Sequence, residues 1–216
     1  MQKEVKWVPY ELTERSIEKR KTMCEILIQR QQRKSFLHRI VTGDEKWIYF
    51  DNPKRTKHWT DPGQPVKLTP KRNIHGKKVL LCIWWDQKGV LYYELLKPGQ
   101  TITGEVYKGQ LNKLNQSLKE KRPEWANRHE RVILLHDNAR PHVAKTVKQT
   151  LKTLGWDVLP HPPYSPDVAP SDYHLFRSMA STSWIASKEE KFYFDGIHKL
   201  TKNWKKVILN DGNYIQ

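Results

Sequence analysis

The spacing of hydrophobic positions along the 216 residues predicts a chain that alternates between helices and strands. Residues 10–40 carry apolar side chains at helical intervals, with a largely basic opposite face and Thr13 as a suitable N-cap. The same periodicity predicts a helix over 103–121. A third helix is expected to begin at Pro141, because a proline is tolerated in a first turn, and to end at Gly155.

Short apolar runs predict the strands, which we place at 46–50, 79–85, 90–96, 132–135 and 156–159. The second and third runs are joined only by Asp86-Gln87-Lys88-Gly89, a turn that predicts a hairpin. The fourth is apolar throughout, which is typical of a strand buried on both faces. Five prolines within 160–170 predict an extended crossing, after which Ser171 or Asp172 begins a helix.

This order of elements predicts one α/β domain, built as a mixed β-sheet flanked by helices on both faces. Between the first two strands, residues 51–78 hold eight Lys or Arg and two Asp. A connection of that length inside a compact domain is usually functional or disordered.

Composition narrows the function. The 39 Lys and Arg against 23 Asp and Glu give a net charge of +16, which favours a polyanionic partner such as nucleic acid. No apolar run approaches the roughly 18 residues of a membrane-spanning helix, so no membrane association is expected. The nine Trp and nine Tyr argue against disorder. Cys24 and Cys82 have no metal-binding or redox spacing, which indicates a reducing, intracellular compartment.

Three aspartates stand at predicted element boundaries. Asp44 lies just before the first strand, Asp137 follows the buried fourth strand, and Asp172 opens the helix after the proline-rich crossing. Neighbouring strands bring such ends together. Three carboxylates on rigid elements can hold two hard cations about 3.5–4 Å apart, which activate water or a 3′-hydroxyl for phosphoryl transfer.

Each aspartate also has an ordinary structural interpretation. Asp172 is well placed to cap its helix, and Asp44 and Asp137 are common turn residues. Glu45 and Asp167 are competing carboxylates that spacing alone does not exclude.

Other chemistries have less support. Four histidines near these motifs fit no zinc-ligand spacing and are expected to be surface residues or supporting residues: His136, His142, His161 and His174. There is no glycine-rich phosphate loop and no nucleophile elbow.

The sequence around the three aspartates resembles the signature motifs of mariner-family transposases. The blocks are Val41-Thr42-Gly43-Asp44-Glu45-Lys46-Trp47, Leu135-His136-Asp137-Asn138-Ala139-Arg140-Pro141-His142 and Tyr164-Ser165-Pro166-Asp167-Val168-Ala169-Pro170-Ser171-Asp172-Tyr173-His174. The 34 residues between Asp137 and Asp172 are the spacing that defines the family. Further matches at 7–12, 84–85 and 196–200 extend the resemblance over nearly the whole chain.

The resemblance implies a ribonuclease-H-like fold of the retroviral-integrase type over 41–216, with 1–40 as the end of a linker and a basic helix leading into it. It implies that Asp44, Asp137 and Asp172 are the catalytic, metal-binding triad, with two Mg²⁺ or Mn²⁺ ions per site. The implied reaction is cut-and-paste transposition: cleavage of DNA strands at transposon ends and strand transfer into TA target sites. A homodimer in the nucleus is the expected working form.

The resemblance also implies contacts outside the triad. Segment 51–78 resembles the family's clamp loop, and DNA binding is expected from Lys54, Arg55, Lys57, Lys71, Arg72, Lys77 and Lys78. Trp7, Val8 and Pro9 resemble the linker that helps the two subunits pair.

Two departures from the family pattern affect the functional prediction. The N-terminal helix-turn-helix domains that read the inverted repeats are expected to be absent, which leaves DNA binding through phosphates, with strong salt dependence. The stretch after Met179 is shorter than the pattern by about one helix and a turn, on the order of 20 residues. The alternative function is therefore a decayed or domesticated remnant that binds DNA or dimerises without catalysis.

A basic RNA-binding domain is a third hypothesis, but it gives the aspartates no role.

We predict that replacing Lys54, Arg55 and Lys57 together with Ala lowers the salt dependence of DNA binding. If each contacts a phosphate, the slope of log K against log salt falls by up to about three. Titrations of fluorescent duplex DNA at several salt concentrations measure the slope. An unchanged slope would place these side chains away from the DNA.

Overall fold

The computed structural model describes residues 10–50, 76–125, 131–177, 179, 185 and 187–215. Its centre is a five-stranded sheet in the order β3-β2-β1-β4-β5. The strands are β1 (Ile40–Tyr49), β2 (Lys78–Asp86), β3 (Gly89–Leu96), β4 (Ile133–Leu135) and β5 (Asp157–Val158). Because β1 is antiparallel to β2 and parallel to β4, the predicted mixed sheet is confirmed.

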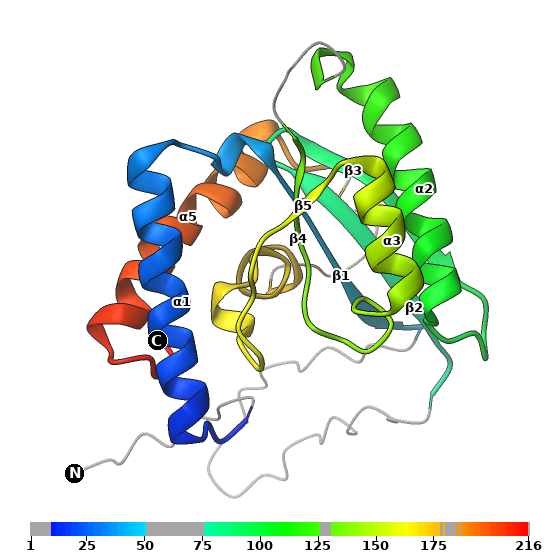
Figure 1. Ribbon diagram of the computed structural model, residues 1–216. Helices are drawn as coiled ribbons and strands as arrows, with labels where there is room; N and C mark the ends of the chain where they lie inside the picture. The colour runs from blue at the N-terminus through cyan, green and yellow to red at the C-terminus, as the bar shows by residue number, and fades with distance from the viewer. Residues whose placement is uncertain are drawn as a thin grey trace, which may run out of the picture.

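Helices cover both faces of this sheet, as Figure 1 shows, with α1 and α5 on one side and α2 and α3 on the other. They are α1 (Glu14–Arg33), α2 (Gly104–Lys121), α3 (Lys145–Leu154) and α5 (Glu190–Leu209). Short 3-10 helices occupy Leu37–Arg39, Pro123–Trp125 and Pro166–Val168, and the π-helix η4 occupies Ser171–Phe176. Within the described ranges, none of the helices is long and apolar enough to cross a bilayer.

Several predicted elements are confirmed. The β2–β3 hairpin turns at Gly89, whose φ of +132° suits glycine. Thr13 and Thr103 cap α1 and α2 by accepting backbone N–H bonds, and Gly155 ends α3 in the left-handed conformation. The buried strand β4 lies where its apolar run predicts.

The prediction of one helix over 10–40 is wrong. Helix α1 ends at Arg33, because the side chain of Gln31 accepts the backbone N–H of Phe36 at 3.1 Å and the chain turns. Phe36 and Leu37 are buried from this turn rather than from a helix face. Their spacing in the sequence matches a helical repeat, but they reach the core from the turn after α1 and not from an α-helix.

Strand β1 begins at Ile40, six residues earlier than predicted. Ile40, Val41 and Thr42 pair with β4, and the residues from Thr42 to Tyr49 pair with β2. Asp44 therefore lies inside a central strand, opposite Ile83, and not in a turn before it. Helix α3 begins at Lys145 rather than Pro141, because residues 139–143 form a tight turn in which two N–H groups bond the Ala139 carbonyl.

A buried ion pair ties the chain ends to the proline-rich crossing. The fully buried guanidinium of Arg20, on α1, donates to both carboxylate oxygens of Asp167 at 2.9 and 2.6 Å and to the hydroxyl of Ser165 at 2.6 Å. Its Nε also donates to the carbonyl of Gly212 at 2.8 Å, beyond α5. Arg20 thus joins three segments that are far apart in sequence, one of which leads directly into η4.

We predict that Arg20→Ala lowers the free energy of unfolding by about 3–5 kcal/mol, because it leaves the Asp167 carboxylate without its buried partner. Urea unfolding followed by circular dichroism measures the change.

Lys21→Ala is the matched control. Lys21 is the next residue of α1, and its pair with Asp211 is solvent-exposed, so its removal should cost far less stability than Arg20→Ala. Equal losses in the two variants would contradict the assignment.

Candidate active site

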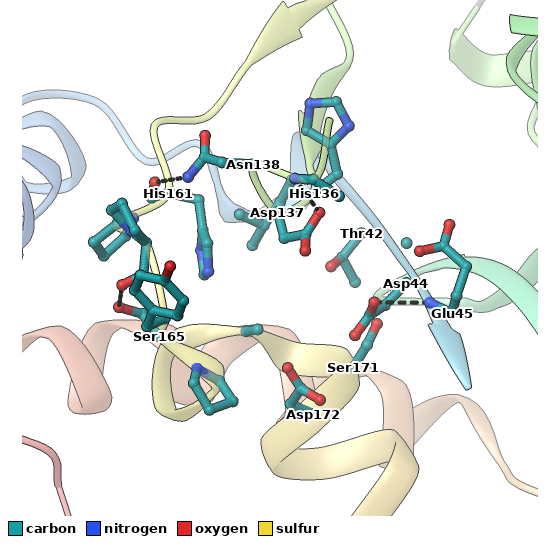
Figure 2. Close-up of a pocket in the computed structure, with 18 residues that line it drawn as sticks. Thr42, Asp44, Glu45, His136, Asp137, Asn138, His161, Ser165, Ser171 and Asp172 are labelled. Atoms are coloured by element: carbon teal, nitrogen blue, oxygen red, sulfur yellow. Dashed lines mark hydrogen bonds between the residues drawn. The ribbon is translucent and has the colours of Figure 1, made fainter. Parts of the chain in front are cut away.

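A cavity of about 720 Å³ opens where β1, the end of β4, the proline-rich crossing and η4 meet. Asp44, Asp137 and Asp172 all line it, as Figure 2 shows. The three aspartates chosen from sequence thus reach one cavity from three separate elements. Parallel pairing of β1 with β4 explains this for the first two, because it sets Thr42 beside Leu135, two residues before each aspartate.

Asp44 points from β1 into the cavity. Burial raises the pKa of its carboxyl well above the ordinary value, and the negative charges of Asp172 and Glu45 raise it further. The backbone N–H of Glu45, 2.7 Å from Oδ1, opposes this rise in pKa. The local environment therefore disfavours the ionised form of Asp44.

Asp137 is held by His142, which the sequence indicated only as a surface or supporting residue. The Nδ1 of His142 lies 2.6 Å from Asp137 Oδ1, and the N–H of Ala139 donates to the same oxygen at 2.9 Å. Although burial raises the pKa of Asp137, these bonds lower it overall. The turn around Pro141 carries His142 back toward Asp137. The five-residue spacing, with a proline between, was therefore the sequence feature that could have predicted this contact.

His142 is also paired with Glu45. Its Nε2 lies 3.3 Å from Glu45 Oε1, at ion-pair distance but without hydrogen-bond geometry. Although burial lowers the pKa of His142, its contacts with Asp137 and Glu45 raise it to about 9. Glu45 is thus occupied by a positive partner, which distinguishes it from Asp44, the neighbouring residue on the other face of β1.

Two more rings pack against His142. The His142 ring packs at a tilt against Tyr107, with centroids 4.1 Å apart, and lies nearly parallel to the His136 ring. The Nδ1 of His136 shares a 2.9 Å hydrogen bond with the Tyr107 hydroxyl. Both histidines are buried, so the surface alternative for them is wrong. Burial and the charge of His142 lower the pKa of His136 to about 4.

Asp172 lies in the first turn of η4. The N-cap position is Pro170 and no side chain caps the helix, so the capping alternative is wrong. Ser171 instead accepts a 3.1 Å bond from the Trp85 indole, which fixes the start of η4 against β2. Burial and the charge of Asp137 raise the pKa of Asp172 to about 6, while Lys46 opposes the shift.

Lys46 links β1 to the far end of η4. Its ammonium donates to the Phe176 carbonyl at 2.6 Å and lies 5.1 Å from the centre of the Phe176 ring. Burial lowers the pKa of Lys46, and the charges of Asp172 and Asp44 counteract this. The competing carboxylate Asp167 is occupied by Arg20, as described above.

The donor set suits a hard divalent cation, because carboxylate oxygens are the ligands that Mg²⁺ and Mn²⁺ prefer. Burial and the neighbouring carboxylates raise the pKa values of Asp44 and Asp172, and a bound divalent cation would favour their ionised forms. In the described part of the chain, no three His, Cys, Asp or Glu side chains form a ready-made ligand set for one ion. Mg²⁺ sites commonly use one or two carboxylates, with water and substrate phosphate completing the set.

The remaining sequence-predicted contacts are mostly outside the described residues. These are Trp7, Val8, Pro9, Lys54, Arg55, Lys57, Lys71 and Arg72. Lys77 precedes β2 and Lys78 begins it; the Lys78 ammonium lies 4.6 Å from the centre of the Trp47 ring.

The chain is similar to known proteins along its whole length. Residues 49–128 match the family described as "Transposase (partial DDE domain)". All of the chain aligns at 53% identity with 68% of the Mariner Mos1 transposase of Drosophila mauritiana. It is 42% identical, over 97% of its length, to 33% of the human histone-lysine N-methyltransferase SETMAR.

Solved structures agree with this relationship. The Mos1 mariner paired end complex with Mn matches the whole chain and 68% of its own chain, with a TM-score of 0.94 and 54% identity. The catalytic domain of Mos1 mariner transposase matches over 97% of this chain and 100% of its own, with a TM-score of 0.82 and 50% identity. The expected ribonuclease-H-like fold is confirmed.

We predict that Asp172→Asn stabilises the metal-free protein at neutral pH. The folded state holds the Asp172 proton more tightly than the unfolded state, so the stability that this proton provides is present at low pH and lost as pH rises from about 4 to about 6. The variant should gain about 1–2 kcal/mol over wild type at pH 8, after allowance for solvent screening, and little at pH 3.5. Urea unfolding in EDTA across this pH range measures the difference. A stability gain that shrinks as pH rises would contradict the raised pKa of Asp172.

Proposed function

Because this chain belongs to the mariner family of transposases, we propose that it cleaves DNA strands at transposon ends and transfers them into TA target sites in the cavity of Figure 2. The observation that carries this proposal is that Asp44, Asp137 and Asp172 line one cavity. The related Mos1 structures include a paired-end complex, a pre-cleavage transpososome and a strand transfer complex, which supports a DNA substrate.

Mg²⁺ or Mn²⁺ is the proposed cofactor, with two ions per site held by the three aspartates. The Mos1 paired end complex has been solved with each metal, and the carboxylate donors here suit both. Such ions supply charge neutralisation and activation of a water or 3′-hydroxyl in an in-line phosphoryl displacement.

The side chains around the aspartates have defined supporting roles in this proposal. His142 fixes the rotamer of Asp137 through its 2.6 Å contact, which leaves Oδ2 free of the bonds that hold Oδ1. Lys46 and Ser171 anchor the two ends of η4 on the sheet, so Asp172 keeps its position at the cavity. Rigid support of this kind reduces the reorganisation needed when metal and DNA enter.

The remaining features of the proposal concern the whole protein. We place the catalytic domain at 41–216, with α1 packed against α5 as the end of the preceding linker. DNA contacts from the basic segment 51–78, a homodimer paired through Trp7, Val8 and Pro9, and action in the nucleus are proposed from the family relationship and the net charge of +16.

An inactive DNA-binding remnant is the alternative function. The intact aspartates and the ordered contacts of His142 and Lys46 favour the enzyme, because a protein that only binds DNA gains nothing from holding three carboxylates together in a partly buried cavity. The carboxylates of the cavity disfavour phosphate in the absence of cations, which makes metal dependence the property that separates the two functions.

We predict that the wild-type chain binds Mn²⁺ in calorimetric titrations, and that Asp137→Ala lowers the affinity by at least about tenfold because a hard oxygen ligand is lost. In the same variant, Mn²⁺-dependent cleavage of transposon-end DNA should disappear, while metal-free DNA binding is unchanged or tighter.

Asp157→Asn is the control, since Asp157 lies on the adjacent strand β5 and is half-exposed near Arg39 and Arg131, outside the cavity. Its Mn²⁺ affinity should equal that of wild type. A folded wild-type chain that neither binds Mn²⁺ nor cleaves DNA would support the inactive remnant.

A further inference from the structure

His161 lines the cavity, and the proposed function gives it no role. It lies in the proline-rich crossing, between Pro160 and Pro162, and Figure 2 shows it across the cavity from Asp44. Its backbone carbonyl accepts a 2.7 Å bond from the side chain of Asn138, which follows Asp137. The position of His161 is therefore fixed by its proline neighbours and by a tie to the Asp137 loop.

The His161 ring projects into the cavity without a partner. No described side chain or backbone group hydrogen-bonds either ring nitrogen. Burial lowers the pKa of His161 to about 4, so the ring is neutral at physiological pH and presents one N–H donor and one acceptor. The residue is only partly buried, so its ring nitrogens face the cavity and are not bonded within the described protein.

Two ordinary roles fit His161 poorly. A structural histidine is bonded within the protein, as His136 is to Tyr107 in the same cavity. A metal-ligating role would add an imidazole nitrogen to a site of carboxylate oxygens, whereas Mg²⁺ and Mn²⁺ prefer oxygen ligands. The Asp167 carboxylate behind the crossing is already bound to Arg20. The ring nitrogens of His161 thus remain available to a molecule that enters the cavity.

We propose that His161 contacts the DNA substrate, donating a hydrogen bond from its ring N–H to a non-bridging phosphate oxygen of the strand in the cavity. This inference rests on the proposed function. A neutral imidazole suits that place because it provides a donor without a positive charge, which would repel divalent cations at the aspartates. The opposite wall of the cavity then holds the phosphodiester while the aspartates hold the metal.

The test compares DNA binding by wild type, His161→Ala and His161→Asn in Ca²⁺, which is chosen to support binding without cleavage. Each is titrated with duplexes that carry one methylphosphonate at successive positions near the transposon end, read by fluorescence anisotropy. At one phosphate position, either the methylphosphonate or the His161→Ala substitution alone should lower the affinity for the duplex by about five- to tenfold. Combining the two changes should cause no further loss. His161→Asn, which keeps an N–H donor, should recover part of the affinity.

The controls separate this contact from other causes. His198→Ala, on α5 with its ring near Gln87 and outside the cavity, should bind as wild type does. Mn²⁺ affinity of His161→Ala should be unchanged; a tenfold loss would identify a metal ligand and overturn the proposal. Additive losses at every phosphate, or full affinity in His161→Ala, would also overturn it. Loss of Mn²⁺ binding by wild type itself would instead reject the proposed function.

Discussion

Asp44, Asp137 and Asp172 reach the same cavity from elements that are distant in sequence, and burial makes the proximity of their charges costly. The cost appears as raised pKa values at Asp44 and Asp172, each increased by a neighbouring aspartate. Carboxylates in such positions would move apart if the elements that carry them were flexible. Much of the surrounding structure can be understood as the means by which they are kept in place.

Each aspartate has its own support. Asp44 belongs to β1, which is paired on both sides by β2 and β4. Asp137 is held by the His142 imidazolium, itself packed against Tyr107. Asp172 depends on η4, whose ends are bonded to the Trp85 and Lys46 side chains and whose approach is fixed by the buried Arg20–Asp167 pair. The supports become less regular from Asp44 to Asp172, so the third position depends most on individual side chains.

The sequence was sufficient for the sheet, the helix pattern and the three aspartates, because these follow from local hydrophobic spacing and from motifs. It failed where a side-chain bond or a strand pairing that periodicity does not reveal decides the local structure. Gln31 ends α1 through the Phe36 N–H, and pairing with β4 extends β1 back to Ile40, which places Asp44 within a strand. The Arg20–Asp167 pair spans 147 positions, and no periodicity in the sequence marks it. The contact of His142 with Asp137 could have been predicted, because a turn through Pro141 brings the residue five positions later back to Asp137.

The distribution of charge has a consequence for how DNA and metal act together. The chain carries a net charge of +16, so its surface attracts DNA at long range, yet the cavity itself is lined by carboxylates that repel phosphate. Attraction to the surface therefore does not bring a phosphodiester to the aspartates unless cations offset their charge. Binding of DNA and its entry into the cavity become separate events, and only the second requires metal. A neutral donor such as His161 fits this division, because it can hold the phosphate without competing with the cations.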